Sequence, residues 1–250
     1  MRSTDGSTTP TAATRRPDRS ERPARSLSTG QPGRSGEPGR IRRFSPAERM
    51  VHRATGWLML VCLGSAACLY LGPLAQLVGR RHPVAMVHEW SGICLPVPVL
   101  LGLLSREFRA DLRRLNRFAA YDQQWLNAVR RRRSGPEARP AGKFNAGQKL
   151  YAGWIAGAVL VMMFTGLLMW RTGFLPDISR TSAIFVHDVL AWAITVVVIG
   201  HLRKAYQDPE ARRGMRTGQV SRSWVARHHS RWLGDGVGDE GAGSQGTKGR

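Results

Sequence analysis

The sequence predicts an all-α membrane protein, a bundle of four transmembrane helices flanked by disordered tails. The apolar residues are gathered in four blocks of roughly 20 residues, and a helix of that length crosses the ~30 Å hydrocarbon core of a bilayer. Lysine and arginine are concentrated in alternate connections between these blocks. The mean hydropathy of −0.28 averages the blocks with the polar tails, so it conceals the membrane character.

The two ends of the chain are predicted to be disordered. Residues 1–40 are rich in Arg, Ser, Pro and Gly, and they lack the apolar stretch of a secretory signal peptide. Residues 234–250 are similarly rich in Gly. The folded membrane domain is therefore expected at residues 41–233.

The four helices of this domain are expected at about residues 54–74, 84–104, 150–170 and 183–202. None has the polar stripe that a helix of a soluble bundle keeps toward water, which argues against a soluble protein. Glu89 and Asp188 are the acidic residues inside the blocks, and each lies beside a histidine. Pro96 and Pro98 are expected to kink the second helix.

The basic residues predict the orientation in the membrane. Lys and Arg number 12 before the first block, 12 in the central loop and 10 after the fourth block, whereas four lie in the two short connections. By the positive-inside rule, both termini and the central loop are cytoplasmic in a multi-pass protein of the cell membrane. This distribution accounts for the net charge of +21 without a nucleic-acid partner, for which no motif is present.

The central loop, residues 105–149, is predicted to contain an amphipathic helix on the cytoplasmic membrane surface. Arginines separate apolar residues that recur near helical spacing, namely Phe108, Leu112, Leu115, Phe118, Trp125 and Val129. Such a helix is attracted to anionic membrane lipid.

Four histidines near helix ends predict two metal centres. An ionisable residue in a membrane helix is costly, so it is treated as functional by default, although a single histidine is often an ordinary core residue. His52 opens the first helix and His201 closes the fourth, both on the cytoplasmic side. His88 and His187 lie near the outer ends of the second and fourth helices. We therefore expect the pairs His52/His201 and His88/His187.

The spacing of these histidines favours haem over a bare metal ion. His187 and His201 are about 21 Å apart along the helix axis and point to similar sides. Zinc would instead require three or four ligands at one point. A small residue follows three of the histidines by one turn, leaving room for a flat macrocycle. These residues are Gly56, Gly92 and Ala191. Two b-type haems, each with two axial histidines, would transfer electrons rather than bind oxygen.

Three segments carry a resemblance to a known family. They are Arg43-Phe44 with Glu48-Arg49-Met50-Val51-His52, the run Lys143-Phe144-Asn145-Ala146-Gly147-Gln148-Lys149, and Gly218-Gln219-Val220-Ser221-Arg222-Ser223-Trp224 with His228-His229 and Arg231-Trp232. On these segments residues 41–233 resemble the cytochrome b (gamma) subunit of membrane-bound formate dehydrogenases. That family lies within the cytochrome b561-like group, which also serves nickel–iron hydrogenases. The basic run Arg130–Arg133 and Ser230 depart from the family pattern.

The resemblance implies an electron-transfer subunit without a complete active site of its own. The four histidines would ligate two haems b, which carry electrons from an iron–sulfur subunit and its catalytic oxidoreductase subunit to quinone. Asn145, Gly147 and Gln148 become candidates for quinone contact, because a quinone carbonyl needs hydrogen-bond donors at the membrane edge. Alternatively, Asn145 simply caps the third helix.

Other functions remain open at this stage. A cytochrome b subunit of a nickel–iron hydrogenase or of another respiratory oxidoreductase would have the same fold. A haem-free membrane anchor is a further alternative, in which the histidines would be ordinary buried residues.

Overall fold

The computed structural model describes residues 39–170 and 177–234, all within one compact unit. These residues form eleven helices and two short strands. In chain order they are β1 (Arg40–Arg42), α1 (Pro46–Tyr70), α2 (Gly72–Val78), α3 (Arg81–Cys94), α4 (Val97–Gly102), α5 (Arg106–Leu115), α6 (Ala120–Arg130), α7 (Ala146–Trp170), α8 (Asp177–Gln207), α9 (Pro209–Thr217), β2 (Gln219–Ser221), α10 (Arg222–His228) and α11 (Ser230–Gly234). The predicted tails lie outside the described residues, apart from Gly39, Arg40 and Gly234.

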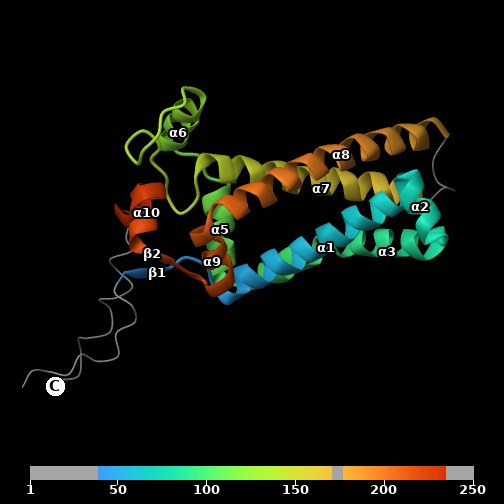
Figure 1. The fold of residues 1–250 in the computed structure, drawn as a ribbon, viewed down its shortest axis with the longest axis horizontal. Helices are drawn as coiled ribbons and strands as arrows, with labels where there is room; N and C mark the ends of the chain where they lie inside the picture. The colour runs from blue at the N-terminus through green and yellow to red at the C-terminus, as the bar shows by residue number, and fades with distance from the viewer. Residues whose placement is uncertain (1–38, 171–176, 235–250) are drawn as a thin grey trace, which may run out of the picture. The chain divides into compact units, whose positions relative to one another are not determined.

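The long helices form two antiparallel hairpins, α1 against α3 and α4, and α7 against α8 (Figure 1). Four spans are long and apolar enough to cross a membrane, at Pro46–Tyr70, Arg81–Gly102, Ala146–Trp170 and Arg180–Gln207. The predicted fold class, an all-α multi-pass membrane protein, is therefore confirmed. A buried apolar cluster joins the hairpins, formed by Met59, Leu95, Ala158, Ile194 and Val198.

The first span begins at Pro46 rather than near residue 54, because a capping box starts the helix in polar sequence. The Ser45 hydroxyl accepts a hydrogen bond from Glu48 N at 3.2 Å, and the Glu48 carboxylate accepts one from Ser45 N. The helix ends at Tyr70, close before Pro73, and the short α2 then runs to Gly79 with φ of 65°.

The second span is interrupted, as its prolines predict. α3 ends at Cys94 and α4 begins at Val97, with Leu95 and Pro96 between them. The third span extends beyond its apolar block at its start and the fourth extends at both ends, because the helices continue into polar sequence.

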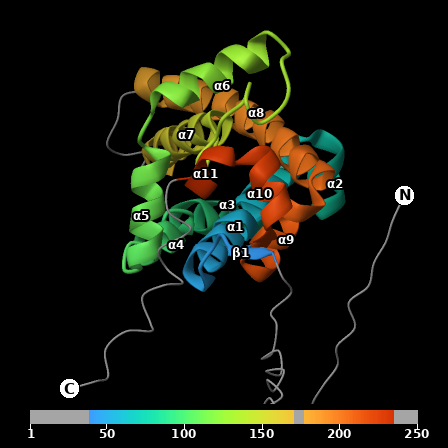
Figure 2. The same ribbon diagram turned by 90° about the vertical axis from the view of Figure 1, so that its left-hand side faces the viewer.

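The chain segments flanking the bundle fold together into a terminal cap made of β1, α9, β2, α10 and α11 (Figure 2). β1 and β2 pair antiparallel, with Ile41 opposite Val220. These two residues pack with Trp224 and Val225 in a small buried cluster. The cap lies at the end of the bundle where α1 begins and α8 ends (Figure 1).

Buried polar contacts fasten the cap to the central loop. The Arg43 guanidinium donates to the Lys143 carbonyl at 3.0 Å and lies 4.8 Å from the centre of the Trp224 ring. Burial lowers the pKa of Arg43 to about 10, so the guanidinium remains charged at neutral pH. His229 Nδ1 donates to the Gly142 carbonyl at 2.7 Å.

The central loop forms two helices, α5 and α6, rather than one continuous amphipathic helix. Asn116 ends α5, and α6 starts after Ala119, whose backbone N–H donates to Asp122. Asp122 also pairs with Lys149 of α7 at 2.6 Å, and both side chains are buried. This ion pair ties α6 to the start of the third span.

Candidate functional site

The four histidines lie in two pairs at opposite ends of the bundle. The ring centres of His52, on α1, and His201, on α8, are 6.2 Å apart with an interplanar angle of 49°. Those of His88, on α3, and His187, on α8, are 6.3 Å apart at 73°. Helix α8 thus contributes one histidine to each pair. After the orientation that the sequence predicts, we name His52/His201 the inner pair and His88/His187 the outer pair.

These separations fit two imidazoles on opposite faces of one metal ion. A ligating nitrogen lies about 2 Å from the metal and roughly 1.1 Å from its own ring centre, which gives about 6.2 Å between ring centres. Both pairs match this value. No group of three or more His, Cys, Asp or Glu side chains suited to a metal ion occurs in residues 39–170 and 177–234. The donor sets therefore fit a planar group that needs two axial ligands better than a tetrahedral zinc ion.

The outer pair is held through the Nδ1 atoms of both rings. His88 Nδ1 lies 3.0 Å from the Cys62 carbonyl and 3.2 Å from the Ser65 hydroxyl, both on α1. His187 Nδ1 lies 2.9 Å from the Thr165 hydroxyl on α7. A hydrogen bond from Nδ1–H fixes the tautomer, so Nε2 carries the lone pair available to a metal.

The inner pair is supported by an aromatic contact. The Tyr151 ring of α7 stacks on His201, with ring centres 4.9 Å apart and an interplanar angle of 13°. This contact orients the His201 imidazole from the side of the second hairpin. His52 lies one turn after Glu48, within the capped first turns of α1.

The small residues predicted to leave room for a flat macrocycle differ in the space around them. A Cβ added at Gly56 would meet no atom within 4 Å, so the backbone beside His52 is open. A Cβ at Gly92 would lie 3.8 Å from Cys62 Sγ, which already occupies part of that space. Open backbone for a flat macrocycle is thus clearest beside the inner pair.

The quinone candidates lie at the start of α7. The Asn145 side chain accepts from Gln148 N at 2.9 Å, and the Gln148 side chain accepts from Asn145 N at 3.0 Å. This reciprocal capping uses the amide oxygens and leaves both NH₂ groups as donors. Gly147 is a point of close packing, because a Cβ there would lie 3.0 Å from Trp125 Cη2. Gln148 lies one helical turn from Tyr151 and hence from the inner pair.

Sequence reasoning missed three of these supporting residues. Ser65 and Thr165 are buried hydroxyls within apolar helices, where a polar side chain is a weak signal because it commonly bonds its own helix. Tyr151 follows the resemblance segment 143–149, and its aromatic ring at the membrane edge was a readable signal.

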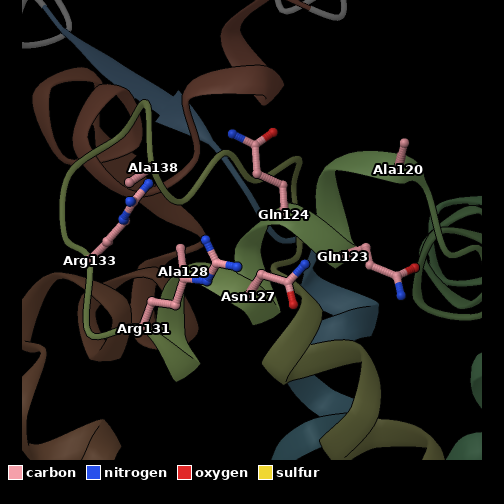
Figure 3. A pocket seen from close by; sticks show the side chains of 8 residues that line it. All are labelled: Ala120, Gln123, Gln124, Asn127, Ala128, Arg131, Arg133 and Ala138. Atoms are coloured by element: carbon pink, nitrogen blue, oxygen red, sulfur yellow. The ribbon is translucent and has the colours of Figure 1, made fainter.

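A separate cavity of about 450 Å³ lies beside α6 and the loop that follows it (Figure 3). Carboxamides and arginines surround it, from Gln123, Gln124, Asn127, Arg131 and Arg133. Arg131 and Arg133 of the basic run therefore line a surface hollow, together with Ala120, Ala128 and Ala138. No histidine lines it, so it is distinct from the paired site.

Comparison with known proteins gives consistent matches. A family profile described as prokaryotic cytochrome b561 matches residues 43–206. The formate dehydrogenase cytochrome b556(fdo) subunit of Escherichia coli K12 is 27% identical over 201 residues, covering 76% of this chain and 90% of that protein. The nitrate-inducible cytochrome b556(Fdn) subunit of the same organism is 25% identical, covering 74% and 88%. The formate dehydrogenase cytochrome b556 subunit of Haemophilus influenzae is 25% identical, covering 77% and 81%.

Proposed function

The chain belongs to the prokaryotic cytochrome b561 family, and from this premise we propose that it carries electrons from an iron–sulfur partner subunit across the membrane to quinone. The family is one of membrane cytochromes b, so this multi-pass protein binds haem b and transfers electrons. The proposal adds two haems, a direction and an acceptor.

One observation carries the proposal of two haems, namely the two histidine pairs. Their ring separations of 6.2 and 6.3 Å each suit one iron between two imidazoles. Along α8, His187 and His201 are separated by about 21 Å, a distance that would suit one pair near each face of the membrane. Two axial imidazoles leave iron without an open position, which suits electron transfer and not oxygen binding.

The chain's own residues set the geometry of this function. Haem, when bound, supplies the one-electron redox chemistry. His52 and His201 would hold the inner group, with Tyr151 stacked on His201. His88 and His187 would hold the outer group through Nε2, with Nδ1 of each engaged by the neighbouring helix.

We propose that the protein lies in the plasma membrane, with both termini and the central loop in the cytoplasm. In support, the terminal cap and helices α5 and α6 gather at the end of the bundle where α1 begins and α8 ends (Figure 1), and these helix ends carry His52 and His201. The sequence of these segments is strongly basic. Electrons would then travel from the outer pair to the inner pair.

The proposed quinone site lies at the start of α7, near the inner pair. Asn145 and Gln148 each keep an amide NH₂ that would donate to a quinone carbonyl. Gly147 contributes by letting Trp125 pack closely against this turn. Gln148 lies one helical turn before Tyr151, whose ring stacks on His201, and this supports the placement.

The proposed complex is a formate dehydrogenase, in which this chain would assemble with an iron–sulfur subunit and a catalytic subunit. The supporting relatives are cytochrome subunits of formate dehydrogenases, aligned over about three quarters of this chain and most of their own length. In this proposal the chain supplies the electron-transfer site, and the catalytic subunit supplies the substrate-oxidising centre.

Reduced-minus-oxidised spectra of the full chain in purified membranes test the proposal. We expect a b-type α band and two haems per chain by pyridine haemochrome assay. A chain without this band would be a haem-free anchor. When the chain is purified with its native partners, formate should reduce the haems; reduction by hydrogen and not by formate would assign the complex to a hydrogenase.

A further inference from the structure

Two buried hydroxyls occupy equivalent places in the two helical hairpins. Ser65, on α1, faces a histidine of α3, and Thr165, on α7, faces a histidine of α8. Ser65 is 8% exposed and Thr165 is 5% exposed. We propose that Ser65 and Thr165 are positioning residues that orient His88 and His187 and set how strongly these imidazoles donate to the outer haem.

The contacts of the Ser65 hydroxyl determine whether it donates or accepts in its hydrogen bond with His88. Its hydroxyl donates to the Val61 carbonyl at 2.8 Å or the Cys62 carbonyl at 3.0 Å, one turn back on α1. Its oxygen lone pairs are then free to accept from His88 Nδ1–H at 3.2 Å. The Cys62 carbonyl accepts from the same nitrogen at 3.0 Å, so two acceptors share one proton.

Thr165 repeats this arrangement. Its hydroxyl donates to the Val161 carbonyl at 2.9 Å or the Met162 carbonyl at 3.1 Å. His187 Nδ1 lies 2.9 Å from the Thr165 oxygen, a shorter contact than the one at Ser65. In addition, a Cβ at the adjacent Gly166 would lie 3.5 Å from His187 Cε1, an ordinary van der Waals distance, so the ring lies beside this part of α7.

The consequence concerns the strength of the axial ligands. An acceptor at Nδ1–H draws the proton away from the ring, which raises the basicity of Nε2 and stabilises the oxidised iron. Loss of the hydroxyl should therefore raise the reduction potential of the outer haem. The Cys62 carbonyl remains as an acceptor at His88 and the Met162 carbonyl remains as one at His187, so each single substitution should shift the potential only in part. The inner pair is supported by the stacked Tyr151 ring instead. The reduction potential of the inner haem should therefore not change in these variants.

The test uses Ser65→Ala and Thr165→Val in the full chain in membranes, with the midpoint potentials of both haems and the low-spin electron paramagnetic resonance signals as readouts. The inference rests on the proposed function, so the wild-type chain is measured first. A wild-type chain without two haems refutes the dihaem proposal itself. The haem that is lost in His88→Ala identifies the outer one.

Matched controls come from two hydroxyls whose described hydrogen bonds go only to backbone carbonyls. Ser91 is buried on α3 and donates to the His88 carbonyl at 3.0 Å, and Thr195 on α8 donates to the Ala191 carbonyl at 2.7 Å. Ser91→Ala and Thr195→Val should leave both potentials unchanged. The conservative variants Ser65→Thr and Thr165→Ser keep the hydroxyl and should keep the wild-type potentials.

The expected result is an upward shift of the outer potential, with altered resonance signals, two haems retained and the inner potential unchanged. Loss of the outer haem in Ser65→Ala or Thr165→Val, with retention in the conservative variants, would also support a positioning role. Unchanged potentials in both variants overturn the inference. Loss of the outer haem in Ser65→Thr or Thr165→Ser also overturns the inference, because side-chain volume and not the hydroxyl would then be responsible.

Discussion

Arg43 Nη2 lies 3.2 Å from His229 Nε2, although 186 residues separate them in the chain. Because His229 Nδ1–H donates to the Gly142 carbonyl, Nε2 is the acceptor for the guanidinium. A single neutral imidazole thus links the segment before the first span, the central loop and the terminal cap.

This link makes the terminal cap sensitive to acid. Burial, and then the charge of Arg43, lower the pKa of His229 to about 3, whereas an unfolded histidine has a pKa of about 6.5. Between these values the unfolded cap binds a proton that the folded cap does not. The free energy of unfolding should therefore fall as the pH drops from about 6.5 toward 3, by roughly 1 kcal/mol per pH unit.

Hydrogen exchange of residues 219–232, corrected for the intrinsic pH dependence, measures this effect. His229→Gln keeps one acceptor and one donor but does not titrate, so its cap should lose the pH dependence. The exposed neighbour provides the control, since His228→Gln should behave like the wild type. Equal pH dependence in His229→Gln and the wild type would rule out this role for His229.

Each histidine pair should act as a unit. His52→Ala and His201→Ala should each leave one haem per chain, and the double variant should also leave one. The same should hold for His88→Ala and His187→Ala, whereas His52→Ala/His187→Ala should leave none. Haem content by pyridine haemochrome assay decides this, and a pairing of His52 with His88 would contradict the arrangement along α8.

The two roles of Asn145 can be separated by one substitution. Asn145→Asp keeps the oxygen that caps α7, and Asp caps a helix about as well as Asn, so stability should change by about 0.5 kcal/mol or less. It removes the NH₂ donor proposed for quinone. We expect KM for quinone to rise several-fold while haem content and melting temperature stay unchanged. Unaltered quinone reduction would restrict Asn145 to capping.

Gly147 should act through Trp125. Gly147→Ala brings Cβ to 3.0 Å from Trp125 Cη2, so the tryptophan must shift by a few tenths of an ångström, and we expect a destabilisation of about 1 kcal/mol. Trp125→Phe should restore the melting temperature and quinone reduction in the double variant. On the same helix, Gly153→Ala would meet no atom within 4 Å and serves as the control. Failure of the double variant to recover quinone reduction would indicate direct contact between Gly147 and quinone.

The sequence was sufficient for the architecture because hydropathy and charge report on the membrane directly. The four spans and the break near Pro96 follow from apolar length and from proline, and the early start of α1 was readable in the capping box from Ser45 to Glu48. The division of the central loop into α5 and α6 could not be predicted from the sequence, because apolar residues continue at helical spacing across the break.

The supporting contacts of the site could not be predicted from the sequence, because they depend on which helices become neighbours. His229 follows the last span in a basic segment, and nothing in the sequence around it shows that folding buries it against Arg43. Ser65 and Thr165 show the same limit. Each hydroxyl also bonds a carbonyl of its own helix, so the residue type alone does not indicate the contact with a histidine. The proximity of distant segments is tertiary information that a single sequence does not carry.

Because α8 supplies a histidine to both pairs, the order of synthesis has a consequence for assembly. The ribosome releases α8 after the other three spans, so neither pair is complete until this last span enters the membrane. In a chain truncated before residue 187, His52 and His88 would lack their partners, so we expect neither proposed haem site to form in a half-made protein. Biogenesis of the two centres thus ends in one event, the insertion of a single helix.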